Sequence, residues 1–194
     1  ADKNYIVYGY NTCDAFYNSE HLTAVQTYDF TSFTEKSYLR SVCTRCETGT
    51  VLKEIAPLFT CLGYSAYEVG GDGIAIGYMV NNEAIDEYTS ITGKSLTYGV
   101  FVASQNKLGN NDIFDQEGNK TSGVVSVEIT NYEFAVFELK VIGFTDENKD
   151  KALAMGAYAA VTTEGATEYV YMQDAKPDNG EKYSYVTYNG IVNK

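Results

Sequence analysis

The sequence predicts a mainly β protein with one short helix. The chain of 194 residues contains 18 Tyr, no Trp and only 2 Pro, a composition suited to pleated, half-buried strands. Short runs of β-type residues recur after Pro57, with turn signals between them. A single segment carries helix start and stop signals instead. The length allows one large domain, or a main domain of about 140 residues with a small appendage.

The strand prediction after Pro57 rests on runs at a regular spacing, which is typical of a sandwich or a barrel. These runs are 58–64, 73–80, 96–104, 124–130, 134–142, 154–162, 168–172 and 183–192. Within the second run, apolar residues alternate at Ile74, Ile76, Tyr78 and Val80. Since alternate side chains of a strand share one face, we expect these four on the core side.

Residues 82–93 break the strand pattern. Asn82 can cap a helix, acidic residues follow in the first turn, and Gly93 can end it. Ile85, Tyr88 and Thr92 would share a face, so we expect about three turns of helix lying on the sandwich.

Two segments rich in Gly, Asn and Asp, 105–123 and 174–182, are expected to be loops. The first includes Asp112, Asp115, Glu117 and Asn119, whose side-chain oxygens could bind a cation. They invite a calcium interpretation, but their spacing does not match an EF-hand loop. A solvated acidic loop is the favoured interpretation.

Residues 1–56 concentrate the chemically unusual side chains, namely three of the four Cys, the only His and both Arg. Strand-like runs occur at 5–10 and 37–42. We therefore expect a small Cys/His-containing subdomain at 1–56, followed by the main β domain at 57–194.

Cys13, His21, Cys43 and Cys46 could together hold a zinc ion, because the two-residue gap of the last pair suits a tight turn around one metal. All four positions would then be filled by protein, which makes the zinc structural. Two alternatives stay open. The cysteines could form the disulfides Cys13–Cys61 and Cys43–Cys46 in an oxidising compartment, or His21 could be an exposed loop residue. Against the disulfide alternative, we expect Cys61, which lies inside an apolar run, to be simply a small core side chain, whatever Cys13, Cys43 and Cys46 do.

The charge balance limits the partners. With 14 basic against 26 acidic side chains the formal net charge is -12, so nucleic acid and anionic membranes are disfavoured. The chain has only two arginines, Arg40 and Arg45, that could bind a phosphate in a bidentate manner. This scarcity also disfavours phosphoryl chemistry. No apolar run reaches the roughly 18 residues of a membrane helix, so no membrane insertion is expected.

The sequence contains no recognisable catalytic motif, so we expect a protein that is not an enzyme. There is no G-x-S-x-G motif, and nothing around His21 supports a general base. The glycines at 70–73 precede a strand and predict a hairpin turn, not a phosphate cradle. The acids Glu83, Asp86 and Glu87 are better explained as helix-dipole partners than as a glycosidase pair.

The tyrosines allow a further alternative, a carbohydrate-binding module. Those considered as a sugar-stacking platform are Tyr64, Tyr67, Tyr78, Tyr98, Tyr158, Tyr169 and Tyr171. Tyrosine also fills sandwich cores and strand faces, and this is the favoured interpretation of the set.

Two stretches resemble modules of large secreted and cell-surface proteins of gut Firmicutes. Residues 38–46 (YLRSVCTRC) look like a Tyr, then Cys-Thr-x-Cys-Gly signature, with Glu47 in place of the Gly. Residues 98–103, 154–160 and 169–171 are similar to fibronectin-III or immunoglobulin-like sandwich repeats of the same proteins. The resemblance implies an immunoglobulin-like β-sandwich at the cell surface or outside the cell.

The sequence therefore predicts a non-catalytic extracellular module with a structural, adhesive or recognition role. Its expected partner is an unidentified protein or glycan. The opening residues Ala1–Asn4, without Met, fit a mature exported chain or a fragment. The alternatives are a carbohydrate-binding module and a glycan-directed hydrolase. The hydrolase requires two carboxyl groups in one concave site, one of them with a raised pKa.

Overall fold

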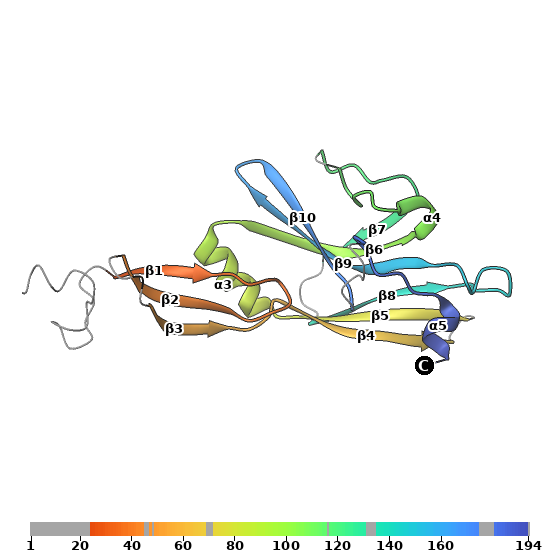
Figure 1. Ribbon diagram of the computed structural model, residues 1–194, viewed down its shortest axis with the longest axis horizontal. Coiled ribbons are helices and arrows are strands. Elements are labelled where there is room, and N and C mark those ends of the chain that lie inside the picture. The colour runs from red at the N-terminus through yellow and green to blue at the C-terminus, as the bar shows by residue number, and fades with distance from the viewer. Residues whose placement is uncertain are drawn as a thin grey trace, which may run out of the picture. The chain divides into compact units, whose positions relative to one another are not determined.

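The structure, a computed structural model, describes residues 24–44, 47, 49–68, 72–115, 117–130, 135–174 and 181–193 (Figure 1). The described chain is mainly β, as predicted, and its strands form three antiparallel sheets. It divides into two compact units, one ending at Pro57 and the other beginning at Leu58.

The first unit contains the sheet β1-β2-β3, formed by Ala24–Asp29, Ser37–Cys43 and Gly49–Ile55. Only the middle strand was predicted, at 37–42, and the run at 5–10 lies outside the described residues. Phe33, Cys43 and Ile55 are buried in this unit. Ser37 is also buried, and its hydroxyl accepts a hydrogen bond from the Thr31 amide at 3.3 Å.

The second unit contains two sheets. The order β4-β5-β8 comprises Phe59–Tyr67, Gly73–Val80 and Val136–Ile142, and the order β10-β9-β6-β7 comprises Ala166–Met172, Leu153–Thr163, Ser95–Ser104 and Val124–Glu128 (Figure 1). Every predicted run after Pro57 except the last coincides with one of these strands, with shifts of a few residues at the ends.

Aromatic side chains join the two sheets. Ile74, Ile76, Tyr78 and Val80 are all buried on β5, which confirms the predicted core face. The Tyr78 hydroxyl donates to the Met172 carbonyl at 2.8 Å. The ring of Tyr98 contacts the rings of Phe59 and Phe137, with centroids 5.1 Å and 5.7 Å away.

The four-stranded sheet is covered on its second face as well. Successive side chains of a strand point to opposite faces of its sheet. By the register of the strands, Phe101 of β6, Tyr158 of β9 and Tyr171 of β10 share the face that points away from the other sheet. Residues 105–123 cover them through Leu108, Ile113 and Phe114, and Tyr183 joins the same buried cluster. Residues 154–161 of β9 are buried without a break as a result.

Helix α3, Asn82–Thr92, confirms the predicted helix but corrects its cap. Asn81 is the capping residue, and its side-chain oxygen accepts from the Ala84 amide at 3.0 Å. Gly93 ends the helix with φ 69°, as predicted. The buried positions are Ala84 and Tyr88, so the helix faces the unit through Tyr88.

Two short helices were not predicted. Residues Tyr188–Val192 form α5, where a strand was expected, because the Thr187 hydroxyl caps the turn by accepting from the Gly190 amide at 3.0 Å. Of the expected strand, only Val186 pairs, in an isolated bridge to Leu153. Residues Gln105–Leu108 form α4 at the start of the expected loop. None of the described helices is long and apolar enough to cross a membrane.

Candidate functional site

A hollow of about 580 Å³ lies between the loop 111–121 and strand β10. We call it the aromatic hollow. Its described lining residues are Asn111, Asp112, Phe114, Asp115, Glu117, Thr121, Thr167, Tyr169 and Tyr171. Three are aromatic, three are carboxylates, and the remaining three carry a hydroxyl or an amide.

The aromatic side of the hollow comes from the alternation of β10. Thr167, Tyr169 and Tyr171 share one face of that strand. The ring of Phe114 stacks on Tyr169 with centroids 4.4 Å apart and planes at 17°. Phe114 also meets Tyr158 edge to face at 4.9 Å. Packed rings of this kind form a rigid surface, and the partial exposure of Tyr169 leaves part of that surface open to a ligand.

A tight turn brings the loop tip to Tyr169. The Gly118 amide donates to the Asp115 carbonyl at 3.1 Å, and Gly118 adopts φ +81°. A Cβ added at Gly118 would lie 3.1 Å from the Tyr169 hydroxyl. Glycine therefore serves both the left-handed turn and the close approach to the tyrosine.

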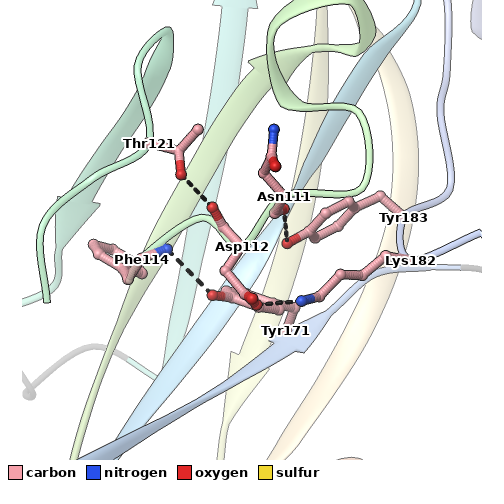
Figure 2. A network of polar contacts seen from close by, with 7 residues as sticks. All are labelled: Asn111, Asp112, Phe114, Thr121, Tyr171, Lys182 and Tyr183. Atoms are coloured by element: carbon pink, nitrogen blue, oxygen red, sulfur yellow. Dashed lines mark hydrogen bonds and ion pairs between the residues drawn. The ribbon is translucent and has the colours of Figure 1, made fainter. Parts of the chain in front are cut away.

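Side chains from outside the loop hold it in place (Figure 2). The Tyr183 hydroxyl donates to the Asn111 carbonyl at 3.1 Å, and the Tyr171 hydroxyl accepts from the Phe114 amide at 3.4 Å. Lys182 forms an ion pair with the Asp112 carboxylate. The hollow is thus preorganised, because its loop is tied to β10 and to the C-terminal segment before any ligand arrives.

Within the loop, the Thr121 hydroxyl donates to the Asp112 carbonyl (Figure 2). Asp115 bonds to Asn119 through both carboxylate oxygens. One oxygen accepts from the Asn119 backbone amide at 2.7 Å, and the other accepts from its side-chain amide at 3.0 Å. These hydrogen bonds, those from the Asn119 side chain first, hold the pKa of Asp115 below its ordinary value. Asp115 is therefore an anion at neutral pH, which is the opposite of what a catalytic acid needs.

The described acids of the loop are not grouped around one point. In the parts of the chain that the structure describes, no three His, Cys, Asp or Glu side chains lie close enough to hold a metal ion. Asp115 is occupied by Asn119 and Asp112 by Lys182. Asp112, Asp115, Glu117 and Asn119 are all exposed, as expected for a solvated acidic loop.

Most of the predicted zinc ligands, Cys13, His21 and Cys46, lie outside the described residues, so the zinc site stays a prediction. Cys43 is buried at the end of β2. The expectation for Cys61 was wrong in part: this residue is only half-buried on β4, and its sulfur lies 3.9 Å from the Asp174 carboxylate. Partial burial raises the pKa of its thiol, which lowers its reactivity.

Of the seven tyrosines considered from the sequence, Tyr64 and Tyr67 are half-buried on β4, and the other five divide into two groups. Tyr78, Tyr98 and Tyr158 are buried, as the core interpretation predicted. Tyr169 and Tyr171 instead line the aromatic hollow. Sequence reasoning noted these two tyrosines and the loop acids separately, and it missed Phe114, Thr121 and Thr167 altogether. The alternation through Thr167, Tyr169 and Tyr171 was the available signal for the strand face.

A second hollow of about 460 Å³ lies between α3 and the start of β6. It is lined by Asn82, Ile85, Asp86, Thr89, Ser95, Leu96 and Tyr98. It offers one carboxylate and one aromatic ring, so the aromatic hollow has more groups that can contact a ligand.

Comparison of the chain with protein-family models, curated proteins and solved structures found no match. The chemistry of the hollow itself is therefore the basis for a functional inference.

Proposed function

We propose that the chain is a non-catalytic recognition module of an extracellular or cell-surface protein, and that its second unit binds a glycan in the aromatic hollow. The observation that carries this proposal is the meeting of the stacked pair Tyr169 and Phe114 with polar side chains in one preorganised hollow.

The architecture supports an immunoglobulin-like β-sandwich for the second unit. Antiparallel sheets of three and four strands meet through buried aromatic side chains, which is the layer arrangement of that class of fold. Immunoglobulin-like sandwiches commonly present a binding site on loops held by a rigid scaffold. The loop 111–121 is held against strand β10 in this way.

The lining suits a sugar. The apolar C–H faces of a pyranose ring pack on aromatic rings such as Tyr169 and Tyr171, while hydroxyl groups of the sugar need hydrogen-bond partners. The carboxylates can accept such bonds, and so can the Thr121 hydroxyl, whose own proton is donated to the Asp112 carbonyl. The Thr167 hydroxyl bonds to that of Thr162 and keeps room to accept, while the side-chain amide of Asn111 can both donate and accept. A volume near 580 Å³ falls in the range of about 300–1,000 Å³ that is usual for small-molecule sites.

Binding without catalysis is favoured over glycan hydrolysis. A glycosidase needs one carboxyl with a raised pKa beside a second, free carboxylate. The pKa of Asp115 is lowered, not raised, and both of its carboxylate oxygens accept hydrogen bonds from Asn119. Asp112 pairs with Lys182.

A glycan array probed with labelled protein tests the proposal. We expect binding to at least one class of saccharide, with a loss of about two- to tenfold for Tyr169→Ala, since one stacking contact is worth roughly 0.5–1.5 kcal/mol. Tyr67→Ala, on β4 and away from the hollow, is the matched control and keeps the affinity. Absence of binding to every saccharide contradicts the proposal. Release of reducing sugar from a bound glycan, abolished by Asp115→Asn, favours the hydrolase instead.

A further inference from the structure

The aromatic hollow carries an excess of negative charge. Its described lining includes the carboxylates of Asp112, Asp115 and Glu117 and no Lys, Arg or His. Lys182 neutralises one of them through its ion pair with Asp112. The charges of Asp115 and Glu117 are left to face a ligand, because Asp115 is held by the neutral amide of Asn119 and not by a cation.

The rings beside these carboxylates also favour a cation. The faces of tyrosine and phenylalanine carry partial negative charge and attract ammonium groups within about 6 Å. Tyr169 and Phe114 form one stacked pair in the lining, and Tyr171 lines the hollow from the same face of β10. Phe114 is buried behind Tyr169, so an ammonium group in the hollow would meet the exposed parts of the Tyr169 and Tyr171 rings beside the carboxylates.

The net negative charge of the whole molecule also favours a cationic ligand. The formal net charge is -12, so anionic saccharides such as uronates and sulfated sugars are repelled before they reach the hollow, while cationic ones are attracted.

Resting on the proposed glycan-binding function, we infer that the ligand of the aromatic hollow is a saccharide bearing protonated amines, that is, a glycan of de-N-acetylated hexosamine. The sugar rings stack on Tyr169 and Tyr171, and an ammonium group lies near Asp115 and Glu117. The same hollow discriminates against the N-acetylated form, which has lost the charge, and against uronates, which reverse it.

Calorimetric titration with matched tetrasaccharides tests this inference. The probes are glucosamine, N-acetylglucosamine, glucose and galacturonate oligomers. The amine is expected to bind about tenfold more tightly than its acetylated or neutral counterparts, and the advantage should shrink when the salt is raised from about 0.02 M to about 0.5 M. Galacturonate should not bind.

The outcomes separate the inference from the proposed function. Equal or tighter binding of the acetylated or neutral oligomer overturns the charge assignment and leaves glycan binding standing. Binding of none of the saccharides overturns both. A lysine-rich peptide that binds more tightly than the glucosamine oligomer shows that the ammonium group belongs to a protein partner, and this too overturns the inference.

Two variants should move the amine affinity in opposite directions, which a folding defect would not do. Glu117→Gln removes a facing charge and should weaken amine binding by up to about fivefold. Lys182→Met frees the Asp112 charge and should strengthen amine binding by a similar factor, because the Tyr171 and Tyr183 hydroxyls still hold the loop. Binding of the N-acetylated oligomer should change little in either variant. Lys151→Met, an exposed lysine outside the hollow, is the control. If both variants weaken amine binding alike, with unchanged melting temperatures, the inference is wrong.

Discussion

Gly99 on β6 faces Tyr158 on β9, and the tyrosine ring fills the space that a side chain at Gly99 would need. A Cβ at Gly99 would lie 2.7 Å from the Tyr158 hydroxyl oxygen and 2.3 Å from the Val127 carbonyl oxygen. Gly156 on β9 stands in the same relation to Phe101, whose ring would lie 3.1 Å from an added Cβ. Since Tyr158 supports Phe114, and Phe114 supports Tyr169, the glycine at position 99 underlies the aromatic hollow.

Gly99→Ala should therefore destabilise the protein. The added methyl would overlap a backbone carbonyl that cannot move without breaking the sheet, so we expect a loss of about 2 kcal/mol in the free energy of unfolding by urea. Gly77→Ala in β5 is the control, because a Cβ there meets its nearest atom at an ordinary 3.5 Å. Equal stability of the two variants would contradict this account.

The stability of the protein should fall above about pH 10. Burial raises the pKa values of Tyr64, Tyr78 and Tyr183 above the ordinary tyrosine value. The folded state thus keeps these protons at a pH where the unfolded state releases them, so the contribution to stability is complete below about pH 10 and declines as the pH rises. Tyr78, which is fully buried, alone contributes a slope of about 1.4 kcal/mol per pH unit.

Absorbance at the tyrosinate band during an alkaline titration measures this effect. The buried tyrosines should ionise only together with the loss of the folded circular dichroism signal. The control is Tyr78→Phe, in which the slope of stability against pH above about pH 10 should become shallower. Ionisation of all 18 tyrosines near pH 10 in a folded sample would disprove the prediction.

Asn81 should contribute to stability as the cap of α3. Asn81→Ala removes the acceptor for the Ala84 amide and should cost about 1 kcal/mol, whereas Asn81→Asp keeps an acceptor and adds a favourable charge at the helix N-terminus. Chemical denaturation of the three proteins should rank Asp at or above Asn, and Ala below both. An alanine variant as stable as the parent would argue against the cap.

The sequence-based zinc site predicts one zinc ion per chain. Elemental analysis of protein made without added metal, followed by melting with and without a chelator, tests it. We expect the chelator to lower the melting temperature of the unit that ends at Pro57, with a smaller effect on the second unit, because structural zinc contributes directly to folding. His21→Ala should reduce the zinc content, while Cys61→Ala should not. A metal-free, fully oxidised sample would rule out the site.

The strands of the second unit could be predicted because each has its own local pattern. The alternation of Ile74, Ile76, Tyr78 and Val80 identified the core face directly. The prediction failed at 183–192, where Tyr183 and Tyr185 alternate like strand residues but belong to a segment that packs over the sheet instead of extending it. Tertiary packing decided that segment, and local propensity did not.

The aromatic hollow could not be assembled from the sequence. Asp112 and Phe114 are more than fifty residues from Tyr169 and Tyr171 along the chain, and nothing local shows that they meet. The meeting depends on β10 pairing with β9 and on residues 105–123 folding over that pair. The sequence predicts a solvated acidic loop, but the apolar side chains of the same loop, Ile113 and Phe114, are part of a buried core.

The continuous burial of β9 has a consequence for the dynamics of the second unit. Its backbone bonds to a neighbouring strand on either edge, and side chains cover it above and below. Its amides are therefore shielded from solvent deuterium in all directions, and only global opening of the unit exposes them. In a hydrogen-exchange time course this strand should be the last to take up label, long after the tip of the turn at Gly118.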